Sequence, residues 1–302
     1  MLNFSSQTQF SKQLLYTTLL SVFMLNTSAV ELKMEGTVCH FETETLKGKI
    51  GDGRFIGFNQ LVHKPTGTVI AGNGPANRHG MLSLYRIFSR NHRYGDAAYN
   101  WKERSISIKE NTVVMKWPST AQRPFEFEAV YSFPTPNKLS LQVKVTAKKE
   151  LIDFEVLISS YFDKNFPKAE VILANGSISS SPKELGFWHA FPYGKQAKTL
   201  ISDGRWQQGI HPVTQDIREN VAFPMSFRRH TNGLTGLIYA KPQDCFAVYT
   251  AHDGEYHYSN YKGLFGKTLK ADASSTANIS LEVGTWNNDE IIKKIKAEAI
   301  KK

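Results

Sequence analysis

The sequence predicts an all-β fold, a large antiparallel β-sandwich with a short helix at its carboxyl end. Over long stretches, apolar and polar residues alternate with a period of two, which is the pattern of a strand with one buried face. Residues that favour turns separate these stretches at short intervals. Only the last segment spaces its apolar residues three to four apart, as an amphipathic helix does.

The amino-terminal segment has the order of a secretory signal peptide. Lys12 precedes an apolar run at residues 14–25, and small residues follow at 27–29. The run is shorter than the roughly 20 residues that a membrane-crossing helix needs. We therefore predict that residues 1–29 are a cleaved signal peptide and that the protein is exported, periplasmic or extracellular; a retained anchor is the alternative. Residues 30–302 show no break in composition and are predicted to form a single domain.

The clearest strands lie in the middle of the chain. Apolar residues occupy every second position of residues 125–133, and the pattern returns in residues 139–147 after a turn at residues 134–137. The two segments predict a hairpin, which residues 154–158 extend into a meander. The other predicted strands rest on shorter runs and are residues 37–45, 55–63, 81–88, 105–109, 112–117, 222–228, 234–240, 246–251 and 277–283.

The last segment is the predicted helix. Asp289 can cap its first turn, and Ile291, Ile292 and Ile295 form an apolar stripe among lysines. We expect this stripe to pack on the edge of the sandwich.

The formal net charge of +10 favours anionic partners such as acidic polysaccharides or lipid surfaces. Solubility alone would account for the charge equally well. Nucleic acid is not an expected partner, because the lysines are scattered and no nucleic-acid-binding motif is recognised. No transmembrane partner is implied.

The chain has two cysteines, Cys39 and Cys245. In an exported protein they could form a disulfide, which would stabilise the fold by up to roughly 4–5 kcal/mol. Two buried free thiols are the alternative. Neither cysteine lies in a recognisable nucleophile motif.

Long irregular stretches between the predicted strands are where we expect a site, since such loops often carry function. In residues 71–80, Arg78 could hold a carboxylate or sugar hydroxyls, and His79 could exchange a proton near neutral pH. The alternative is a structural turn with Arg78 in an ion pair. In residues 89–101, Arg93 and Tyr94 place a cation beside an aromatic ring, a mixture typical of sugar sites.

The most telling stretch surrounds His189, which lies among large aromatic residues and has no acidic residue close by in the sequence. His189 is the strongest candidate for a general acid or base, and a buried structural histidine is the alternative. Trp188, Tyr193 and, further along, Trp206 are candidates for stacking on a sugar ring.

Residues 252–258 offer two carboxylates and two imidazoles. On an extended strand Asp253, Glu255 and His257 would share one face and could form an acid/base group. The spacing matches no recognised zinc motif, and neither a P-loop nor a dinucleotide fingerprint is present. We therefore predict no metal and no cofactor.

Several segments of the chain resemble a galactose mutarotase-like supersandwich domain of the aldose epimerase type, as found in exported bacterial proteins. The resemblance is carried by residues 131–146, which read YSFPTPNKLSLQVKVT, and by residues 159–162, 245–247 and 264–266. It implies a saccharide ligand and leaves the reaction open.

The same resemblance implies roles for particular residues. In aldose epimerases a histidine is the acid and a glutamate the base. The segment that ends at Arg78 is similar to one that contributes a sugar-contacting arginine, and His189 falls where a later catalytic histidine would lie. The glutamate motif of the epimerases has no match, so Glu255 stands in for the base.

Two functions follow from the sequence. The first is an exported carbohydrate-active enzyme, lyase-like or epimerase-like, that acts on a saccharide by histidine-centred acid/base chemistry; the net charge favours an acidic or sulfated polysaccharide. Hydrolysis would need two flanking carboxylates, for which Asp253 and Glu255 are the only clear pair. The second is a non-catalytic carbohydrate-binding or envelope protein on the same fold.

Overall fold

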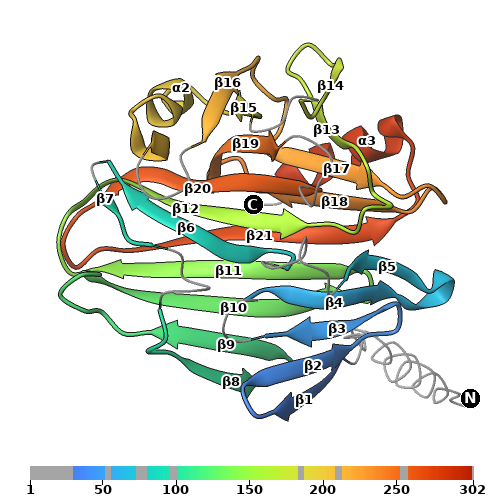
Figure 1. Ribbon diagram of the computed structural model, residues 1–302, viewed down its shortest axis with the longest axis horizontal. Coiled ribbons are helices and arrows are strands. Elements are labelled where there is room, and N and C mark those ends of the chain that lie inside the picture. Colours follow the sequence, from blue (N-terminus) through green and yellow to red (C-terminus); the bar gives the residue numbers. More distant parts are fainter. Residues whose placement is uncertain are drawn as a thin grey trace, which may run out of the picture.

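The computed structural model confirms the all-β prediction: strands make up most of the chain and build three sheets (Figure 1). The structure describes residues 30–51, 56–72, 80–90, 92–95, 101–182, 187–207, 213–251 and 258–300. The signal peptide predicted at residues 1–29 lies outside the described residues.

The first sheet has five antiparallel strands in sequence order. They are β1 (Glu31–Glu35), β2 (Val38–Glu42), β3 (Leu46–Ile50), β4 (Phe58–His63) and, after the short η1 (Lys64–Thr66), β5 (Thr68–Ala71). The strand predicted at residues 37–45 ends early, because Thr43 Oγ1 accepts a hydrogen bond of 2.9 Å from Leu46 N and turns the chain into β3.

The second sheet has nine antiparallel strands in the order β14-β13-β17-β18-β21-β11-β10-β9-β8. Their bounds are β8 (Ser105–Lys109), β9 (Thr112–Trp117), β10 (Phe125–Thr135), β11 (Lys138–Ala147), β13 (Ala169–Ile172), β14 (Ile178–Ser180), β17 (Met225–Arg229), β18 (Thr235–Ala240) and β21 (Ser274–Gly284). The predicted central hairpin is confirmed as β10 and β11, with Phe125 opposite Ala147.

The third sheet has seven strands in the order β16-β15-β19-β20-β12-β6-β7. Their bounds are β6 (Ser83–Ser89), β7 (His92–Arg93), β12 (Leu151–Tyr161), β15 (Phe187–Pro192), β16 (Thr214–Ile217), β19 (Cys245–Ala251) and β20 (Ser259–Leu269). The β15–β16 pair is parallel and all other pairs are antiparallel.

The predicted meander is wrong at its third strand. β12 does not continue the sheet of β10 and β11 but pairs with β6 and β20 in the seven-stranded sheet. The residues from Phe154 to Tyr161 are all buried, so β12 needs cover on both faces and lies near the centre of a sheet, in line with Figure 1.

The five- and seven-stranded sheets form one layer against the nine-stranded sheet. Phe58 and Met81 join the two smaller sheets by a pair of backbone hydrogen bonds of 2.8 and 2.9 Å. Residues of all three sheets share one buried apolar cluster, in which the ring of Phe58 lies 5.4 Å from Phe41 and 5.2 Å from Tyr131. Each such ring stabilises the fold by roughly 1.5–3 kcal/mol through burial.

The opposite, outer face of the seven-stranded sheet carries its own apolar cluster, covered by α2 (Ala197–Ile201) and η3 (Arg205–Gln207). These elements, together with β15 and β16, occupy one end of the molecule (Figure 1). The sequence predicted neither helix nor strand here, because each element is too short to show a period.

The carboxyl-terminal helix is confirmed as α3 (Asn288–Ile300). It packs Ile291 and Ile295 on the outer face of the nine-stranded sheet and not on a sheet edge. Its cap is Asn287 and not Asp289: Asn287 Oδ1 accepts from Glu290 N, and Glu290 Oε2 accepts from Asn287 N, at 3.0 and 2.8 Å. No helix among the described residues is both long and apolar enough to span a membrane.

The two cysteines are separate free thiols. Cys39 lies in the five-stranded sheet and Cys245 in the seven-stranded sheet, and both are buried. Burial raises the pKa of Cys245 to about 12, so this thiol stays protonated at neutral pH.

Candidate functional site

A row of hydroxyl groups crosses the outer face of the seven-stranded sheet. The strand register places Ser83 opposite Ser159, Ser159 opposite Tyr261, and Tyr261 opposite Tyr249. Residues that are directly opposite each other point to the same face. All four side chains are buried, yet the hydroxyls of Ser83 and Ser159 have no hydrogen-bond partner among the described residues. Buried polar atoms without partners are rare in native proteins and call for an explanation.

The row continues into a pair of tyrosine hydroxyls. Tyr261 Oη lies 2.9 Å from Tyr161 Oη and accepts a hydrogen bond of 3.1 Å from Ser259 Oγ. Burial raises the pKa of Tyr261, which keeps the phenol protonated at neutral pH. The network therefore offers protons and lone pairs side by side.

Aromatic rings border the hydroxyl row. Trp188 stacks on Tyr261 with a centroid distance of 4.2 Å and an interplanar angle of 22°. Trp206 lies 5.5 Å from Trp188 and 5.2 Å from Tyr249. The structure thus brings together the two tryptophans that the sequence predicted as stacking residues. Both are buried, and they build the wall of this face through ring contacts within the protein.

Arg86 lies beside this aromatic group. Only 2% of its surface is exposed, and its guanidinium carbon lies 4.8 Å from the centroid of the Tyr85 ring and 5.8 Å from that of Trp206. Nη2 donates to Tyr85 Oη at 3.2 Å. Within the described residues, Nε and Nη1 have no hydrogen-bond partner and no acidic residue forms an ion pair with this arginine.

A β-bulge explains why Arg86 faces the site. Leu157 is opposite Arg86 and Ile158 is opposite Leu84, so Tyr85 is an extra residue on β6. The extra residue lets Tyr85 and Arg86 both lie on the outer face, where simple alternation would place one of them on the inner face.

A buried ion cluster fixes the cover over this face. Arg205 is fully buried and donates to Glu155 Oε2 at 3.0 Å and to Asp203 Oδ2 at 2.7 Å. Burial raises the pKa of Glu155 to about 7 although the Arg205 charge acts in the opposite direction. Since Trp206 follows Arg205 directly, this cluster positions the indole beside Arg86.

His189 points to the other face of the sheet. It lies between Trp188 and Ala190, which belong to the outer cluster, and strand alternation turns its side chain away from them. Nδ1 lies 3.1 Å from Ser180 O, and Nε2 lies 4.0 Å from Asp216 Oδ2. Burial is the largest influence on its pKa and lowers it. The structure does not bring His189 together with the hydroxyl row, and its acid/base role stays a prediction.

The other predicted contacts are spread over the molecule. Tyr94 packs on the core between the sheets, and its hydroxyl lies 3.1 Å from Ser89 Oγ, while Arg93 ends the short edge strand β7. Tyr193 packs against a separate apolar cluster that contains Phe191. Tyr94 and Tyr193 do not belong to the outer apolar cluster of the described residues, whereas Arg93 is opposite Phe88 of that cluster and so points to the outer face.

Five predicted site residues lie outside the described residues: Arg78, His79, Asp253, Glu255 and His257. The described residues nearest to them in the chain contact β12. Gly80 O accepts a hydrogen bond from Tyr161 N at 3.0 Å, and Tyr258 O accepts one from Phe162 N at 2.8 Å. The roles of these five residues stay predictions.

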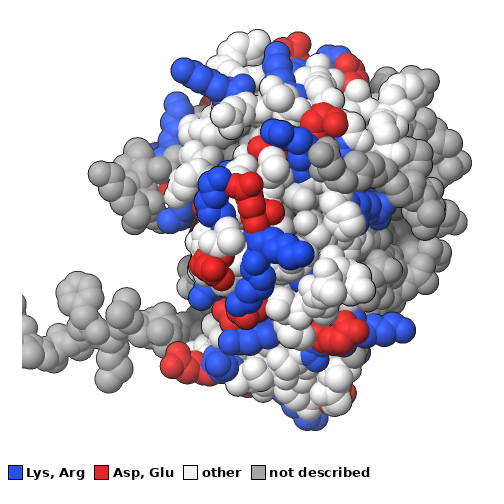
Figure 2. Space-filling model, turned by 90° about the vertical axis from the view of Figure 1, so that its left-hand side faces the viewer, with Lys and Arg blue, Asp and Glu red and all other residues white. Residues whose placement is uncertain are grey.

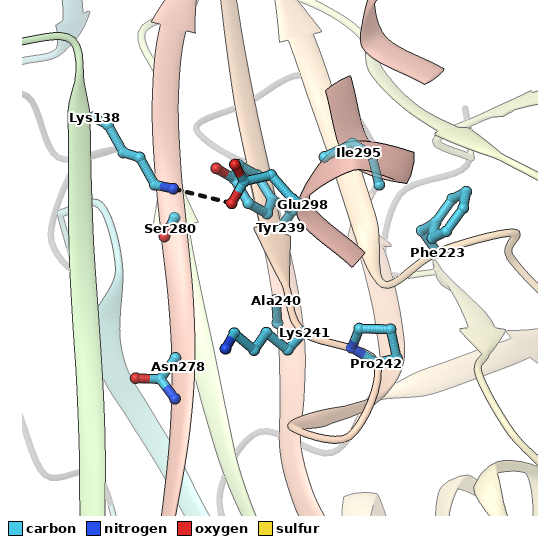
Figure 3. A pocket seen from close by; sticks show the side chains of 10 residues that line it. All are labelled: Lys138, Phe223, Tyr239, Ala240, Lys241, Pro242, Asn278, Ser280, Ile295 and Glu298. Carbon is cyan, nitrogen blue, oxygen red and sulfur yellow. Dashed lines mark hydrogen bonds and ion pairs between the residues drawn. The ribbon is translucent and has the colours of Figure 1, made fainter. Parts of the chain in front are cut away.

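A cavity of about 100 Å³ lies between α3 and the nine-stranded sheet (Figure 3). Lys138 points across it to Glu298, with 3.3 Å between Nζ and Oε2, and its Nζ lies 5.2 Å from the Tyr239 ring. Lys241 is at the rim. Because the inner cation already has a carboxylate partner, this cavity is less suited to a charged ligand than the surroundings of Arg86. The described residues contain no cluster of metal-binding side chains.

The positive net charge does not form one continuous field on the side that Figure 2 displays. Lysine and arginine side chains alternate there with acidic ones. Several cations of the chain are in surface ion pairs, among them Lys148 with Glu126 at 2.8 Å and Lys116 with Glu128 at 2.8 Å. Net charge alone therefore does not locate a binding surface.

No family model and no curated protein matches the chain. Similar solved structures include the α-N-acetylgalactosaminidase NagBb from Bifidobacterium bifidum, with a TM-score of 0.48 and 9% identity, covering 90% of this chain and 38% of that chain. A mutant of heparan sulfate lyase HepC from Pedobacter heparinus has a TM-score of 0.42 and 8% identity, covering 83% of this chain and 34% of that chain.

The GalM/aldose epimerase homologue from C. elegans has a TM-score of 0.41 and 9% identity, covering 86% of this chain and 100% of that chain. It is of the epimerase type that the sequence resembles, and the similar structures include carbohydrate-active enzymes. The chain spans well under two thirds of the galactosaminidase and of the lyase. With TM-scores below 0.5, these likenesses do not transfer an activity to this chain.

Proposed function

We propose that this protein is exported and binds a saccharide on the outer face of the seven-stranded sheet. The observation that carries the proposal is the hydroxyl row, in which the buried hydroxyls of Ser83 and Ser159 have no partner in the described part of the chain and lie beside a wall of aromatic rings. Sugar sites combine apolar surface for the ring C–H groups with a few fixed polar groups for the hydroxyls. The positive net charge favours an acidic or sulfated polysaccharide as the ligand.

The second candidate is a carbohydrate-active enzyme, lyase-like or epimerase-like, on the same face. The observation that favours it is the contact of 2.9 Å between the hydroxyls of Tyr161 and Tyr261. Two hydrogen-bonded phenols can relay a proton to a bound sugar, and both lie in the region of the hydroxyl row. In this reading His189 would need to act from the opposite face, so the tyrosine pair is the better-placed acid.

Ser159→Ala is the sharpest test of saccharide binding. We expect this variant to bind the saccharide about five- to tenfold more weakly, the loss of one hydrogen bond, while its stability stays equal or rises because a buried unpartnered hydroxyl is removed. Ser140→Ala is the matched control, since Ser140 Oγ lies on the nine-stranded sheet and pairs with Ser280 Oγ at 2.8 Å. Calorimetric titration gives affinity, and urea unfolding gives stability. Equal affinity of both variants and the unmodified protein would exclude Ser159 from the site.

Mass spectrometry of soluble products separates the two functions. The protein is incubated with neutral, uronic-acid and sulfated polysaccharides. Unsaturated fragments would establish a lyase, and fragments with one added water a hydrolase. Binding without any product supports the binding protein, and absence of both binding and product across the panel contradicts the proposed function.

A further inference from the structure

We propose that Arg86 binds an anionic group, a carboxylate or a sulfate ester, of the saccharide held on this face. This inference rests on the proposed function and names the chemistry of the ligand at that same site. It assigns to Arg86 a role that the sequence pattern did not reveal.

Arg86 carries a buried positive charge, and burial makes that charge costly. A guanidinium stays protonated at any physiological pH, so Arg86 cannot lower the cost of burial by losing its proton. Burying a cation is unfavourable unless an anion or several acceptors compensate. Among the other buried arginines of the described chain, Arg205 has two carboxylates, Arg228 donates to Asn260 Oδ1 at 2.7 Å, and Arg123 donates to Pro118 O at 2.8 Å. Among the described residues, Arg86 has only the Tyr85 hydroxyl and the faces of two rings as partners.

The geometry of the Arg86 guanidinium also suits an anion. A guanidinium has five N–H groups in one plane, and the structure uses one of them, toward Tyr85. The N–H groups on Nε and Nη1 have no acceptor among the described residues and remain available to a ligand. The rings of Tyr85 and Trp206 hold the guanidinium by cation–π contacts, and these contacts fix the plane in which it would bind an anion. A carboxylate or sulfate oxygen pair matches planar donors of this kind.

Arg86 lies within reach of a sugar ring bound at the hydroxyl row. Arg86 is opposite Leu157, and Ser159 is two residues further along the same strand, which is about 7 Å. A sugar ring whose hydroxyls contact Ser159 can therefore reach Arg86 with a charged substituent at its other end. The β-bulge at Tyr85 is what places the cation on this face.

The test compares ligands that differ only in charge. The probes are a trimer of galacturonic acid, its methyl ester, a neutral galactan trimer and a sulfated galactan trimer, titrated calorimetrically into the unmodified protein, Arg86→Gln and Arg86→Lys. We expect an anionic trimer to bind the unmodified protein at least tenfold more tightly than the neutral trimers. Arg86→Gln should erase this preference, and Arg86→Lys should keep part of it. Preference for the acid over the sulfated trimer, or the reverse, decides which anion is meant.

The outcomes separate this inference from the proposed function. Equal binding of charged and neutral trimers overturns the role of Arg86 and leaves a saccharide site. Binding of no trimer, with no product from the polysaccharide panel, overturns the proposed function itself. A preference for the acid that survives in Arg86→Gln places the anion elsewhere and also overturns the inference.

Thermal unfolding gives a readout that does not depend on the choice of sugar. If Arg86 is an anion-binding residue, Arg86→Met should raise the melting temperature of the ligand-free protein, because the substitution removes an uncompensated buried charge. Galacturonate trimer should raise the melting temperature of the unmodified protein and not that of the variant. A lower melting temperature of Arg86→Met would mean that the arginine is structural and would contradict the inference.

Discussion

Arg205→Met is expected to lower the free energy of unfolding by about 3–5 kcal/mol, the cost of leaving a buried charge without its partner. Arg205 and Glu155 have fully buried side chains, and their charged groups are 3.0 Å apart. Without the guanidinium, Glu155 must either stay ionised in an apolar place or take up a proton, and Asp203 loses its cation as well.

The matched control is Arg90→Met. Arg90 pairs with Asp153 at 2.5 Å, but 53% of its side chain is exposed to solvent. Exposed pairs are worth at most about 1 kcal/mol, so this variant should unfold almost like the unmodified protein. Urea unfolding followed by tryptophan fluorescence measures both. Similar losses in the two variants would show that the cluster around Arg205 is not energetically special.

A double variant tests the cause of the loss. Arg205→Met combined with Glu155→Gln removes the uncompensated charge and should recover part of the lost stability, since replacing both members of a buried pair is often close to neutral. The rescued protein should still bind saccharide more weakly, because Arg205 positions Trp206 beside Arg86. Unchanged saccharide binding by the double variant would mean that apolar contacts alone hold α2 and η3 over the sheet.

The strands that the sequence predicts best have one face exposed to solvent. The hairpin of β10 and β11 was found because solvent on one side keeps every second residue polar. β20 was missed although it is eleven residues long, since both its faces are covered and glycines interrupt it at 263 and 266. Alternation carries no information about a strand that is buried on both sides. For the same reason the sheet to which β12 belongs could not be read from its sequence.

The candidate site depends on register, which sequence spacing does not encode. Trp188 and Trp206 were recognised as aromatic candidates, but their contact with Tyr261 and Tyr249 arises from strands far apart in the chain. Arg86 lies in a predicted strand, and a charged residue inside that apolar run was the one available signal. The orientation of Arg86 depends on the bulge at Tyr85, which no local sequence pattern indicates.

Lys262 should give the molecule a pH-dependent stability that a methionine removes. The side chain is buried between the two layers, where Nζ lies 2.5 Å from Ser226 Oγ on β17. Asn260 Nδ2 also donates to Ser226 Oγ, at 2.8 Å, and the groups near the amine include Cys245 and no carboxylate partner among the described ion pairs. Burial lowers the pKa of Lys262 to about 7.

The direction of this pH dependence is set by the difference in proton binding between the folded and unfolded chains. Between about pH 7 and the ordinary lysine value near 10.4, the unfolded chain holds a proton on Lys262 that the folded chain does not. Raising the pH through this window therefore favours the folded state by about 1.4 kcal/mol per pH unit, and the slope disappears below pH 7 because both states are then protonated.

The experiment compares unfolding free energies of the unmodified protein and Lys262→Met at pH 6, 8 and 9.5. Other groups titrate in this range as well, so the difference between the two proteins isolates Lys262. From pH 8 to pH 9.5 we expect that difference to shift by roughly 2 kcal/mol in favour of the unmodified protein, and to stay nearly constant below pH 6.5. Lys267→Met, on the exposed end of the same strand, is the control and should show no such shift. Parallel pH profiles for Lys262→Met and the unmodified protein would mean that the buried amine keeps its proton throughout, and that Ser226 and the backbone around it solvate a charge between the sheets.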